Sequence, residues 1–344
     1  MNQTTNHEAA LAFCQAWRSG QDLFTLQTSG STGTPKPIQL SRQQMIASAR
    51  LTGQTLGLVP GDAALVCLNV RYIAGVMMLV RGLELELSMT IVEPSANPLA
   101  DFDLEQTQFA FTALVPLQLQ TMLEQAPEKL PILNRMKAIL VGGAATSPAL
   151  EQALQQISAP VYATYGMTET VSHIALRRLN GPEATDYFTA LEGVQIGSDE
   201  RGCLHITAAA GNNHLVQTND VVEMLDNRRF RLLGRADSII NSGGVKIQPE
   251  PVERALQALL SQWRLTPRLF VAGLPDERLG LRLVAFLEKE EITAAQQQSV
   301  KEHITKHLGP YSVPKQFITV PAFRETPTGK IDRLSTIRQL SMQS

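Results

Sequence analysis

The first two thirds of the chain alternate short continuous apolar runs with segments whose apolar residues recur at helical spacing. The apolar runs, which are typical of buried parallel strands, lie at 64–70, 89–93, 109–114, 138–141 and 161–164. The helical segments lie between them at 74–85, 116–125 and 148–157, and a further helix is expected after Ser41, where Gln44 completes a capping box. This alternation predicts an α/β fold in which helices layer a mainly parallel sheet.

The pattern changes twice in the rest of the chain. After Gly181, short strands separated by turns replace the alternation. From Ser238 onward, helices are predicted at 249–262 and 294–308 and strands at 269–274 and 281–287. A segment of this length is sufficient for a small α+β domain. We therefore expect a large layered N-terminal domain at residues 1–236 and a small C-terminal domain at residues 237–344.

Composition narrows the class of protein. A net charge of −2 without a basic, aromatic-rich run gives no reason to expect a nucleic-acid partner. The three cysteines are odd in number and widely spaced, which indicates neither a disulfide framework nor a zinc site. The first ten residues lack the pattern of a secretory signal. The longest apolar segment, at 73–80, is too short to span a bilayer. We expect a cytoplasmic protein without membrane insertion.

The segment Thr28-Ser29-Gly30-Ser31-Thr32-Gly33-Thr34-Pro35-Lys36 is the strongest candidate for chemistry. Glycines allow close approach of the backbone, amides and hydroxyls donate to phosphate oxygens, and Lys36 adds a positive charge. The segment is not a Walker loop, because Lys36 lies between prolines and no helix follows at once. A flexible linker is the alternative, but linkers rarely lie between two apolar strands. The segment therefore predicts a loop that wraps a polyphosphate.

A second segment, Tyr165-Gly166-Met167-Thr168-Glu169-Thr170, directly follows the run at 161–164. A tyrosine can stack on a purine, a threonine can reach a phosphate, and a carboxylate can hold Mg²⁺ beside it. A helix start with a capping threonine and a dipole-matched glutamate is the alternative. That alternative does not explain the neighbouring aromatic residue and glycine.

Two weaker segments complete the set. Gly142-Gly143-Ala144 ends an apolar run and leaves a flat slot beside the backbone, although a Gly-Gly strand exit is usually only a turn. Asp220 can accept hydrogen bonds from both ribose hydroxyls, with Arg235 as a second hydrogen-bonding group.

In this order the segments resemble the motifs of the adenylate-forming enzymes, the acyl-CoA synthetase and luciferase superfamily. The resemblance implies that the loop at 28–36 handles the pyrophosphate part of ATP and that 142–144 lines the adenine. It assigns purine stacking, the α-phosphate and Mg²⁺ to Tyr165, Thr168 and Glu169. Asn219 departs from the usual glycine before the ribose-binding aspartate, but asparagine tolerates left-handed φ.

The resemblance also implies that the small domain rotates between the two steps of the reaction. It makes Asp237 the hinge and Lys330 the lysine that enters the active site during adenylation. Gly243 and Gly244 would swing in for the second step and line the passage for the thiol of coenzyme A. The implied cofactors are ATP, Mg²⁺ and coenzyme A as co-substrate, and the implied partner is a small carboxylic acid.

The acid-binding end is the least typical part. Relatives carry a Phe-His-x-x-Gly-type segment where this chain has Asn69-Val70-Arg71-Tyr72-Ile73-Ala74-Gly75, so Tyr72 replaces the histidine. Arg71 is a candidate for binding a second carboxylate on the substrate, with an exposed loop arginine as the alternative. The early phosphate loop and the strings at 68–81, 92–99 and 240–246 resemble a compact group of 2-succinylbenzoate–CoA ligases of menaquinone biosynthesis.

Other classes stay open from the sequence. They are another aryl- or acyl-CoA ligase, an adenylation enzyme that loads a carrier protein, and a nucleotide-binding pseudoenzyme. Retention of both Lys330 and the Gly243-Gly244 segment favours a two-step ligase. A shortened first domain leaves surface that a second copy could cover, so a homodimer is also expected.

Overall fold

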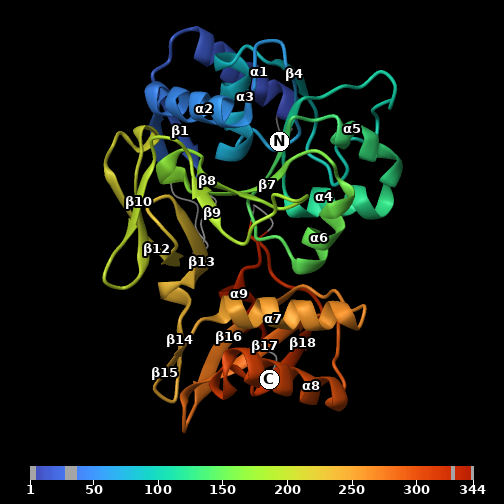
Figure 1. Ribbon diagram of the computed structural model, residues 1–344, viewed down its shortest axis with the longest axis vertical. Coiled ribbons are helices and arrows are strands. Elements are labelled where there is room, and N and C mark those ends of the chain that lie inside the picture. Colours follow the sequence, from blue (N-terminus) through green and yellow to red (C-terminus); the bar gives the residue numbers. More distant parts are fainter. Residues whose placement is uncertain (1–4, 28–36, 327–329, 342–344) are drawn as a thin grey trace.

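A computed structural model describes residues 5–27, 37–326 and 330–341 and has a large upper part above a smaller lower part (Figure 1). The described helices are α1 (Asn6–Arg18), α2 (Arg42–Leu56), α3 (Ile73–Glu84), α4 (Pro116–Gln125), α5 (Leu130–Asn134), α6 (Pro148–Ala153), α7 (Pro249–Gln262), α8 (Ala294–Leu308) and α9 (Arg333–Ser341). Short 3₁₀ turns are η1 (Pro127–Lys129), η2 (Leu154–Gln156), η3 (Thr168–Thr170), η4 (Ala209–Gly211), η5 (Ala236–Ser238) and η6 (Pro310–Ser312). None of the helices in these ranges is long and apolar enough to cross a membrane.

An eleven-stranded sheet organises the described part of the large domain. Its parallel part runs in the order β4 (Ser88–Ile91), β3 (Ala63–Val66), β5 (Phe111–Leu114), β6 (Ala138–Val141) and β7 (Val161–Gly166). Antiparallel pairing continues through β8 (His173–Arg178), β9 (Phe188–Ala190), β13 (Arg229–Arg235), β12 (Leu215–Met224), β11 (Cys203–Thr207) and β10 (Gln195–Ser198). The predicted α/β fold is confirmed, but only the first five strands are parallel. The short strands after Gly181 extend the same sheet by antiparallel pairing.

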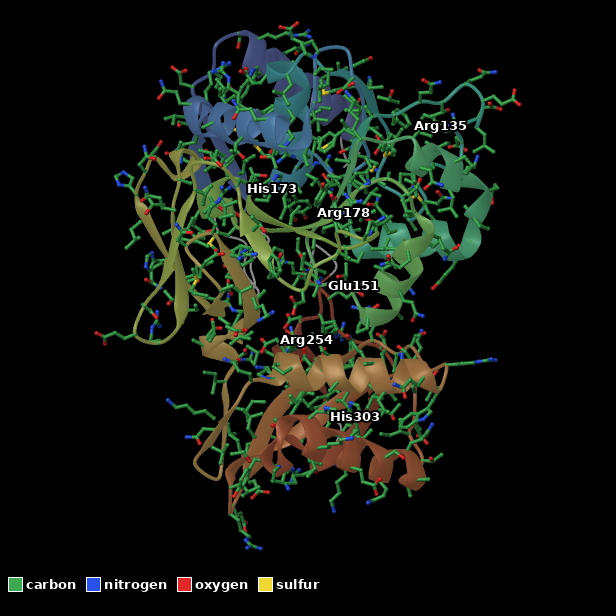
Figure 2. All side chains as sticks on the ribbon, viewed as in Figure 1. Arg135, Glu151, His173, Arg178, Arg254 and His303 are labelled. Carbon is green, nitrogen blue, oxygen red and sulfur yellow. The ribbon has the colours of Figure 1, made fainter. Side chains whose placement is uncertain are left out.

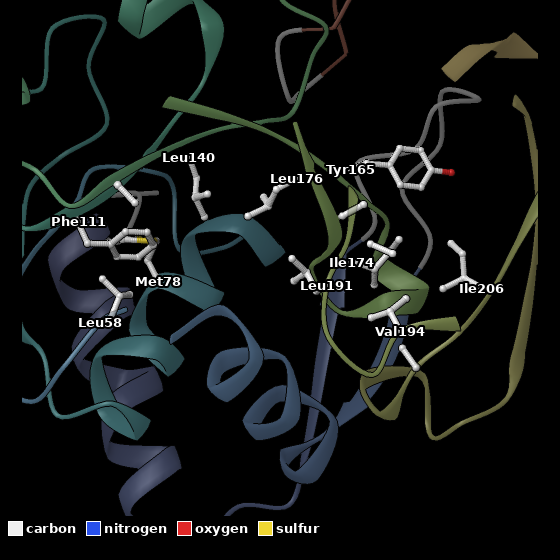
Figure 3. Close-up of a cluster of buried hydrophobic side chains, with 14 of the residues drawn as sticks. Leu58, Met78, Phe111, Leu140, Tyr165, Ile174, Leu176, Leu191, Val194 and Ile206 are labelled. Carbon is white, nitrogen blue, oxygen red and sulfur yellow. The ribbon is translucent and has the colours of Figure 1, made fainter. Parts of the chain in front are cut away.

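Alternation along the buried strands sends side chains to two hydrophobic clusters. Leu65 and Ile139 belong to one cluster, while Val66 and Leu140 belong to the other. Helices α4 and α6 contribute to the first cluster, and α3 contributes to the second, which also includes Tyr165 (Figure 3). Strands β3, β5 and β6 are therefore buried on both faces, which explains why they appear in the sequence as continuous apolar runs.

Two N-terminal elements bracket the predicted phosphate loop. Strands β1 (Leu23–Gln27) and β2 (Pro37–Ser41) pair antiparallel, with Gln27 opposite Pro37. The predicted loop residues Thr28, Ser29, Gly30, Ser31, Thr32, Gly33 and Lys36 lie outside the described residues. The predicted capping box of α2 is present, because Ser41 and Gln44 exchange side-chain and backbone hydrogen bonds of 3.2 and 3.0 Å.

Helix α1 was not predicted, although its start carries a readable signal. Thr5 and Glu8 form a capping box, with the Thr5 hydroxyl 3.1 Å from the Glu8 amide and the Glu8 carboxylate 2.8 Å from the Thr5 amide. A threonine followed three residues later by glutamate is a typical helix start. The helix contributes Ala10 and Trp17 to the core.

The small domain has a separate sheet and core. Its described strands are β14 (Ile240–Ser242), β15 (Val245–Ile247), β16 (Leu269–Asp276), β17 (Gly280–Glu288) and β18 (Gln316–Val320). Phe270 and Phe286 stack with ring centroids 4.6 Å apart in this core. The large sheet ends at Arg235 and the small sheet begins at Ile240, so the predicted boundary between 236 and 237 falls in the junction. That boundary stays a prediction.

Candidate active site

A cavity of about 590 Å³ opens at the carboxyl ends of the parallel strands. In open α/β sheets this edge is the usual place for a ligand, because the loops that follow the strands converge there. The cavity is lined by Cys67, Leu68, Asn69, Tyr72, Ile73, Ala74, Arg81, Pro94, Ser95, Ala96, Ala113, Leu114, Val115, Leu117, Gln118, Leu140, Gly142, Gly143, Thr164, Gly166, Met167, Thr168, Val171, Ser172, His173 and Lys330. Segments far apart in the sequence therefore meet in one cavity.

Part of the predicted nucleotide site lies in this lining. Gly142, Gly143, Gly166 and Thr168 all line the cavity. At Gly142 a Cβ atom would lie 2.4 Å from the hydroxyl of Thr164, so a side chain there would displace its neighbour. The predicted slot beside the backbone stays a prediction; Ala144 lies outside the lining and is exposed.

Tyr165 has neighbours that the sequence did not predict. Its ring is buried against Phe188 and Phe230, with centroids 5.7 and 5.2 Å away, and it does not line the cavity. Its hydroxyl points out of the cluster (Figure 3) and donates to Asp220 over 2.6 Å. Burial, followed by the charge of Asp220, raises the pKa of Tyr165, so the hydroxyl keeps its proton as a donor. The Tyr165 ring therefore lies outside the cavity lining while its hydroxyl is bonded to Asp220, and purine stacking by Tyr165 stays a prediction.

Asp220, Arg235 and Asp237 form one ionic cluster. Arg235 donates to Asp220 over 3.1 Å and to both carboxylate oxygens of Asp237 over 2.8 and 2.7 Å. Hydrogen bonds from Arg235 lower the pKa of Asp237. Each oxygen of Asp220 accepts one of these hydrogen bonds from Tyr165 or Arg235 and keeps capacity for another, so the carboxylate can still accept from a vicinal diol. Strand β12 contains Asp220.

Lys330 comes from the small domain and lines the same cavity as Thr168. In Figure 1 the red C-terminal segment rises from the small domain toward the green strands of the large domain. The Lys330 backbone is tied to Thr326 by hydrogen bonds of 2.8 and 3.1 Å. Burial, followed by the charge of Arg235, lowers the pKa of the Lys330 ammonium. Gly243 and Gly244 form the β14–β15 turn at φ values of 59° and 84°, and they do not line the cavity.

The cavity also contains a buried cation that the sequence did not single out. Arg81 is 2 % exposed and lines the cavity. It donates to Thr52 over 3.3 Å and to Ser172 over 2.5 Å. Among the described residues no carboxylate pairs with it, and burial alone lowers its pKa to about 10. A buried charge without a counter-ion is costly, so this part of the cavity favours an anionic ligand.

His173 lies beside Arg81, between the blue helices and the green strands of the large domain (Figure 2). Its two ring nitrogens lie 3.2 Å from the Ser172 hydroxyl and 3.3 Å from the Thr52 hydroxyl. Burial, together with the Arg81 charge, lowers the pKa of His173 well below its usual value. The ring is therefore neutral at physiological pH and adds no second charge to this part of the cavity.

The predicted substrate residues separate in the structure. Tyr72 lines the cavity as the N-cap residue of α3, whereas Arg71 is exposed and lies outside the lining. Arg81, ten residues further along the chain, is an arginine that does line the cavity. One signal was available in the sequence, because Arg81 interrupts the longest apolar segment of the chain.

The described residues contain no group of three or more side chains that would hold a metal ion by themselves. Glu169 is exposed and follows Thr168 directly. This arrangement fits Mg²⁺, which is commonly held by one or two carboxylates together with substrate phosphates.

Comparisons with known proteins agree with this architecture. The sequence model of the AMP-binding enzyme family matches residues 3–193, and that of the AMP-binding enzyme C-terminal domain matches residues 268–330. A crystal structure from Dyadobacter fermentans, described as an acyl-CoA synthetase (AMP-forming)/AMP-acid ligase II-like protein, is 44% identical. It covers 98% of this chain and 95% of that chain, with a TM-score of 0.65.

Two further relatives have more specific names. A probable 2-succinylbenzoate–CoA ligase of Mycobacterium tuberculosis is 28% identical over 98% of this chain and 90% of its own length. O-succinylbenzoate coenzyme A synthetase of Bacillus subtilis, in complex with ATP and magnesium ion, is 20% identical. It covers 91% of this chain and 69% of that chain, with a TM-score of 0.74, and shows the shared fold.

Proposed function

This chain belongs to the AMP-binding enzyme family, and from that membership we propose that it is an ATP-dependent acid–CoA ligase acting on 2-succinylbenzoate. The observation that supports the proposal most strongly is the layout of the cavity. Lys330 and Thr168 line it together with a buried arginine, Arg81, that has no carboxylate partner among the described residues. A substrate with two carboxylates, one to react and one to pair with Arg81, fits this layout.

The first step joins the substrate carboxylate to the α-phosphate of ATP and releases pyrophosphate. Both reactants are anions, so positive charge and hydrogen-bond donors are needed where they meet. Lys330 supplies a cation and Thr168 a hydroxyl to this part of the cavity. Mg²⁺ held by Glu169 and the phosphates would neutralise further charge. The loop at 28–36 is proposed to hold the departing pyrophosphate.

Nucleotide orientation is assigned to the other polar cluster. Gly142 and Gly143 leave a slot for the adenine, and Asp220 is proposed to accept the ribose hydroxyls. Tyr165 and Arg235 hold the two oxygens of Asp220 over 2.6 and 3.1 Å, so the carboxylate is oriented before the nucleotide arrives. Such prior orientation lowers the entropic cost of positioning the α-phosphate against the acid.

The second step transfers the acyl group from the adenylate to the thiol of coenzyme A and releases AMP. No protein nucleophile is needed, because the adenylate already carries a good leaving group. We assign this step to a second position of the small domain, in which Gly243 and Gly244 replace Lys330 at the cavity. The hinge at Asp237 lies in η5, between the last strand of the large sheet and the first strand of the small one.

The part of the cavity around Arg81 favours this acid over the alternatives. A simple fatty acid or monocarboxylate would leave the Arg81 charge buried and unpaired, at a cost of several kcal/mol. A dicarboxylate with an aromatic ring satisfies the charge, while apolar lining such as Ile73, Leu114 and Leu140 covers the ring. A pseudoenzyme would have no need of either Lys330 or Arg81 in its cavity.

A panel of acids tests the proposal. We expect ATP-dependent CoA thioester formation with 2-succinylbenzoate to exceed that with benzoate, 4-oxo-4-phenylbutanoate and medium-chain fatty acids by at least about 100-fold in kcat/KM, since a lost buried ion pair is worth about 3–5 kcal/mol. Thioester products are measured by mass spectrometry. Faster reaction with a monocarboxylate would refute the assigned acid, and transfer to a carrier-protein thiol but not to coenzyme A would indicate a loading enzyme.

Location and assembly are part of the same proposal. We place the enzyme in the cytoplasm, where ATP and coenzyme A are available, and we propose a homodimer. Exposed Leu11 and Leu23, at 48% and 57% exposure, offer apolar surface near the N-terminus. Light scattering of the purified protein measures the mass in solution directly.

A further inference from the structure

The segment between Thr168 and Ser172, which both line the cavity, contains an unusual backbone conformation. Val171 lies between η3 and β8 with φ 65° and ψ −52°, and its side chain is fully buried. The amide of Ser172 donates to the carbonyl of Thr170 over 2.7 Å, which closes a γ-turn around Val171. γ-Turns with positive φ are rare and strained, and a β-branched residue in this region is a genuine outlier. Such strain persists only where the surroundings enforce it.

One hydroxyl does much of this enforcement. Thr170 is 1% exposed, and its hydroxyl accepts from the Met167 amide over 3.1 Å. The same oxygen lies 3.0 Å from the Met167 carbonyl and 2.9 Å from the Ser172 carbonyl, so its single proton can serve either acceptor. The hydroxyl therefore links the start of η3 to the residue after the strained turn.

Close packing supports the turn from both sides. The Val171 side chain packs in a cluster with residues of α2 and α3, including Met45 and Met77. On the other side, a Cβ atom at Gly166 would lie 2.2 Å from the Ser172 carbonyl, so only glycine allows the strands to approach this closely. The turn is fixed by core packing, by a glycine contact and by the Thr170 hydroxyl.

The turn decides where the next two residues point. Ser172 accepts from Arg81 and contacts one nitrogen of His173, while the other nitrogen of His173 contacts Thr52. Thr52 also accepts from Arg81 and donates to the Ser48 carbonyl over 3.0 Å. One tautomer of His173 satisfies both nitrogens of the imidazole. In this tautomer the Ser172 hydroxyl donates to Nδ1, and Nε2–H donates to the Thr52 hydroxyl.

We propose that Thr170 is a positioning residue, whose hydroxyl holds the strained turn at Val171 so that Ser172 and His173 fix the direction of the Arg81 guanidinium. The turn lies between Thr168 and Ser172, which both line the cavity, so it also fixes the position of Thr168 relative to the Arg81 site. This inference rests on the proposed function for its substrate, but the positioning itself can be observed without any substrate.

The kinetic test compares Thr170→Val, which removes the hydroxyl at constant size, with Thr170→Ser, which keeps it. The readout is the ratio of kcat/KM for 2-succinylbenzoate to that for 4-oxo-4-phenylbutanoate, which lacks the ring carboxylate. We expect Thr170→Val to lower this ratio by about 10-fold, as for a misdirected charge-assisted hydrogen bond, and Thr170→Ser to keep it within about 2-fold. A purely structural role would lower both acids equally, and that result would overturn the proposal.

A spectroscopic test removes the dependence on substrate. In protein with ¹⁵N-labelled histidine, His173 is identified as the signal absent from a His173→Gln variant. We expect a neutral Nε2–H ring in the wild type and in Thr170→Ser, and a changed nitrogen spectrum in Thr170→Val. An unchanged His173 signal in Thr170→Val overturns the positioning role, whereas a wild type without preference for 2-succinylbenzoate counts only against the proposed acid.

A second variant covers the case in which Thr170→Val does not fold. Ser172→Ala removes the hydroxyl that accepts from Arg81, which is the contact between the turn and the guanidinium. We expect it to lower the ratio of kcat/KM values by a similar factor. An unchanged substrate ratio in folded Ser172→Ala would equally contradict the proposal.

Discussion

Lys330→Ala lowers the rate of acyl-adenylate formation by about 100- to 1,000-fold, the range typical for loss of one preorganised electrostatic group. The reason is that two anions meet where Lys330 enters the cavity, and no other lysine or arginine of the described residues lines that cavity apart from Arg81. ATP–pyrophosphate exchange measures this half-reaction. Thioester formation from preformed acyl adenylate should change by less than about 3-fold, since this step is assigned to a position without Lys330.

The matched control is Lys315→Ala, an exposed lysine of the same domain that is not part of the cavity lining. It should leave both half-reactions unchanged. Equal loss of both half-reactions in Lys330→Ala would contradict the alternation of the small domain between two positions.

The pH dependence of adenylation follows from the same lysine. Burial and the Arg235 charge lower the pKa of Lys330, so its charge is lost at a lower pH than that of an ordinary lysine. The rate of adenylation should therefore fall as pH rises through this lowered pKa. The rate of the thioester step should show no such decline at alkaline pH. In Lys330→Arg the guanidinium stays charged, so any residual activity should lose the alkaline decline.

Arg81→Met lowers kcat/KM for 2-succinylbenzoate by about 100-fold or more, because truncating one partner of a buried charge pair costs about 2–5 kcal/mol. Activity with 4-oxo-4-phenylbutanoate should be retained, since this acid has no second carboxylate for Arg81. The free protein should not lose thermal stability, because the variant removes a buried charge that has no counter-ion among the described residues.

Arg50→Met is the matched control, because Arg50 is an exposed arginine on α2 that lies 3.7 Å from the Glu84 carboxylate. Arg50→Met should leave kcat/KM unchanged for both acids. A uniform loss on both acids in Arg81→Met, accompanied by lower stability, would assign Arg81 to folding and not to substrate selection.

Local patterns in the sequence were enough for much of the fold. The strand at 138–141 and the helices at 116–125, 249–262 and 294–308 match the structure at both ends. Each has its own apolar pattern, and each of the three helices also has a proline or a capping box at its start. The hairpin strands after Gly181 were harder, because their pairing with β8 and β9 in one sheet depends on contacts distant in sequence.

In the candidate site, too, local motifs could be predicted from the sequence and contacts between distant segments could not. The segments around Gly142, Thr168 and Lys330 were visible as short motifs, and the structure brings them to one cavity. Arg81 was not, because an arginine at the end of an apolar helix resembles a helix terminator. Its burial depends on Ser172 and on Thr52, which the fold brings to it from other elements.

Tyr165 illustrates a further limit. Its place in a motif was clear from the sequence, but the direction of its ring was not. Packing against Phe188 and Phe230 buries the ring and leaves only the hydroxyl for the site. Side-chain direction of this kind is decided by tertiary packing, which a single sequence does not display.

A single-turnover experiment tests the central claim most directly. The protein is mixed with radiolabelled ATP, Mg²⁺ and 2-succinylbenzoate without coenzyme A, quenched, and analysed for bound products. The account predicts one acyl adenylate and one pyrophosphate for each active site, and conversion of the adenylate to AMP and the CoA thioester when coenzyme A is added. Binding of ATP without pyrophosphate release, or release of ADP instead, would contradict it.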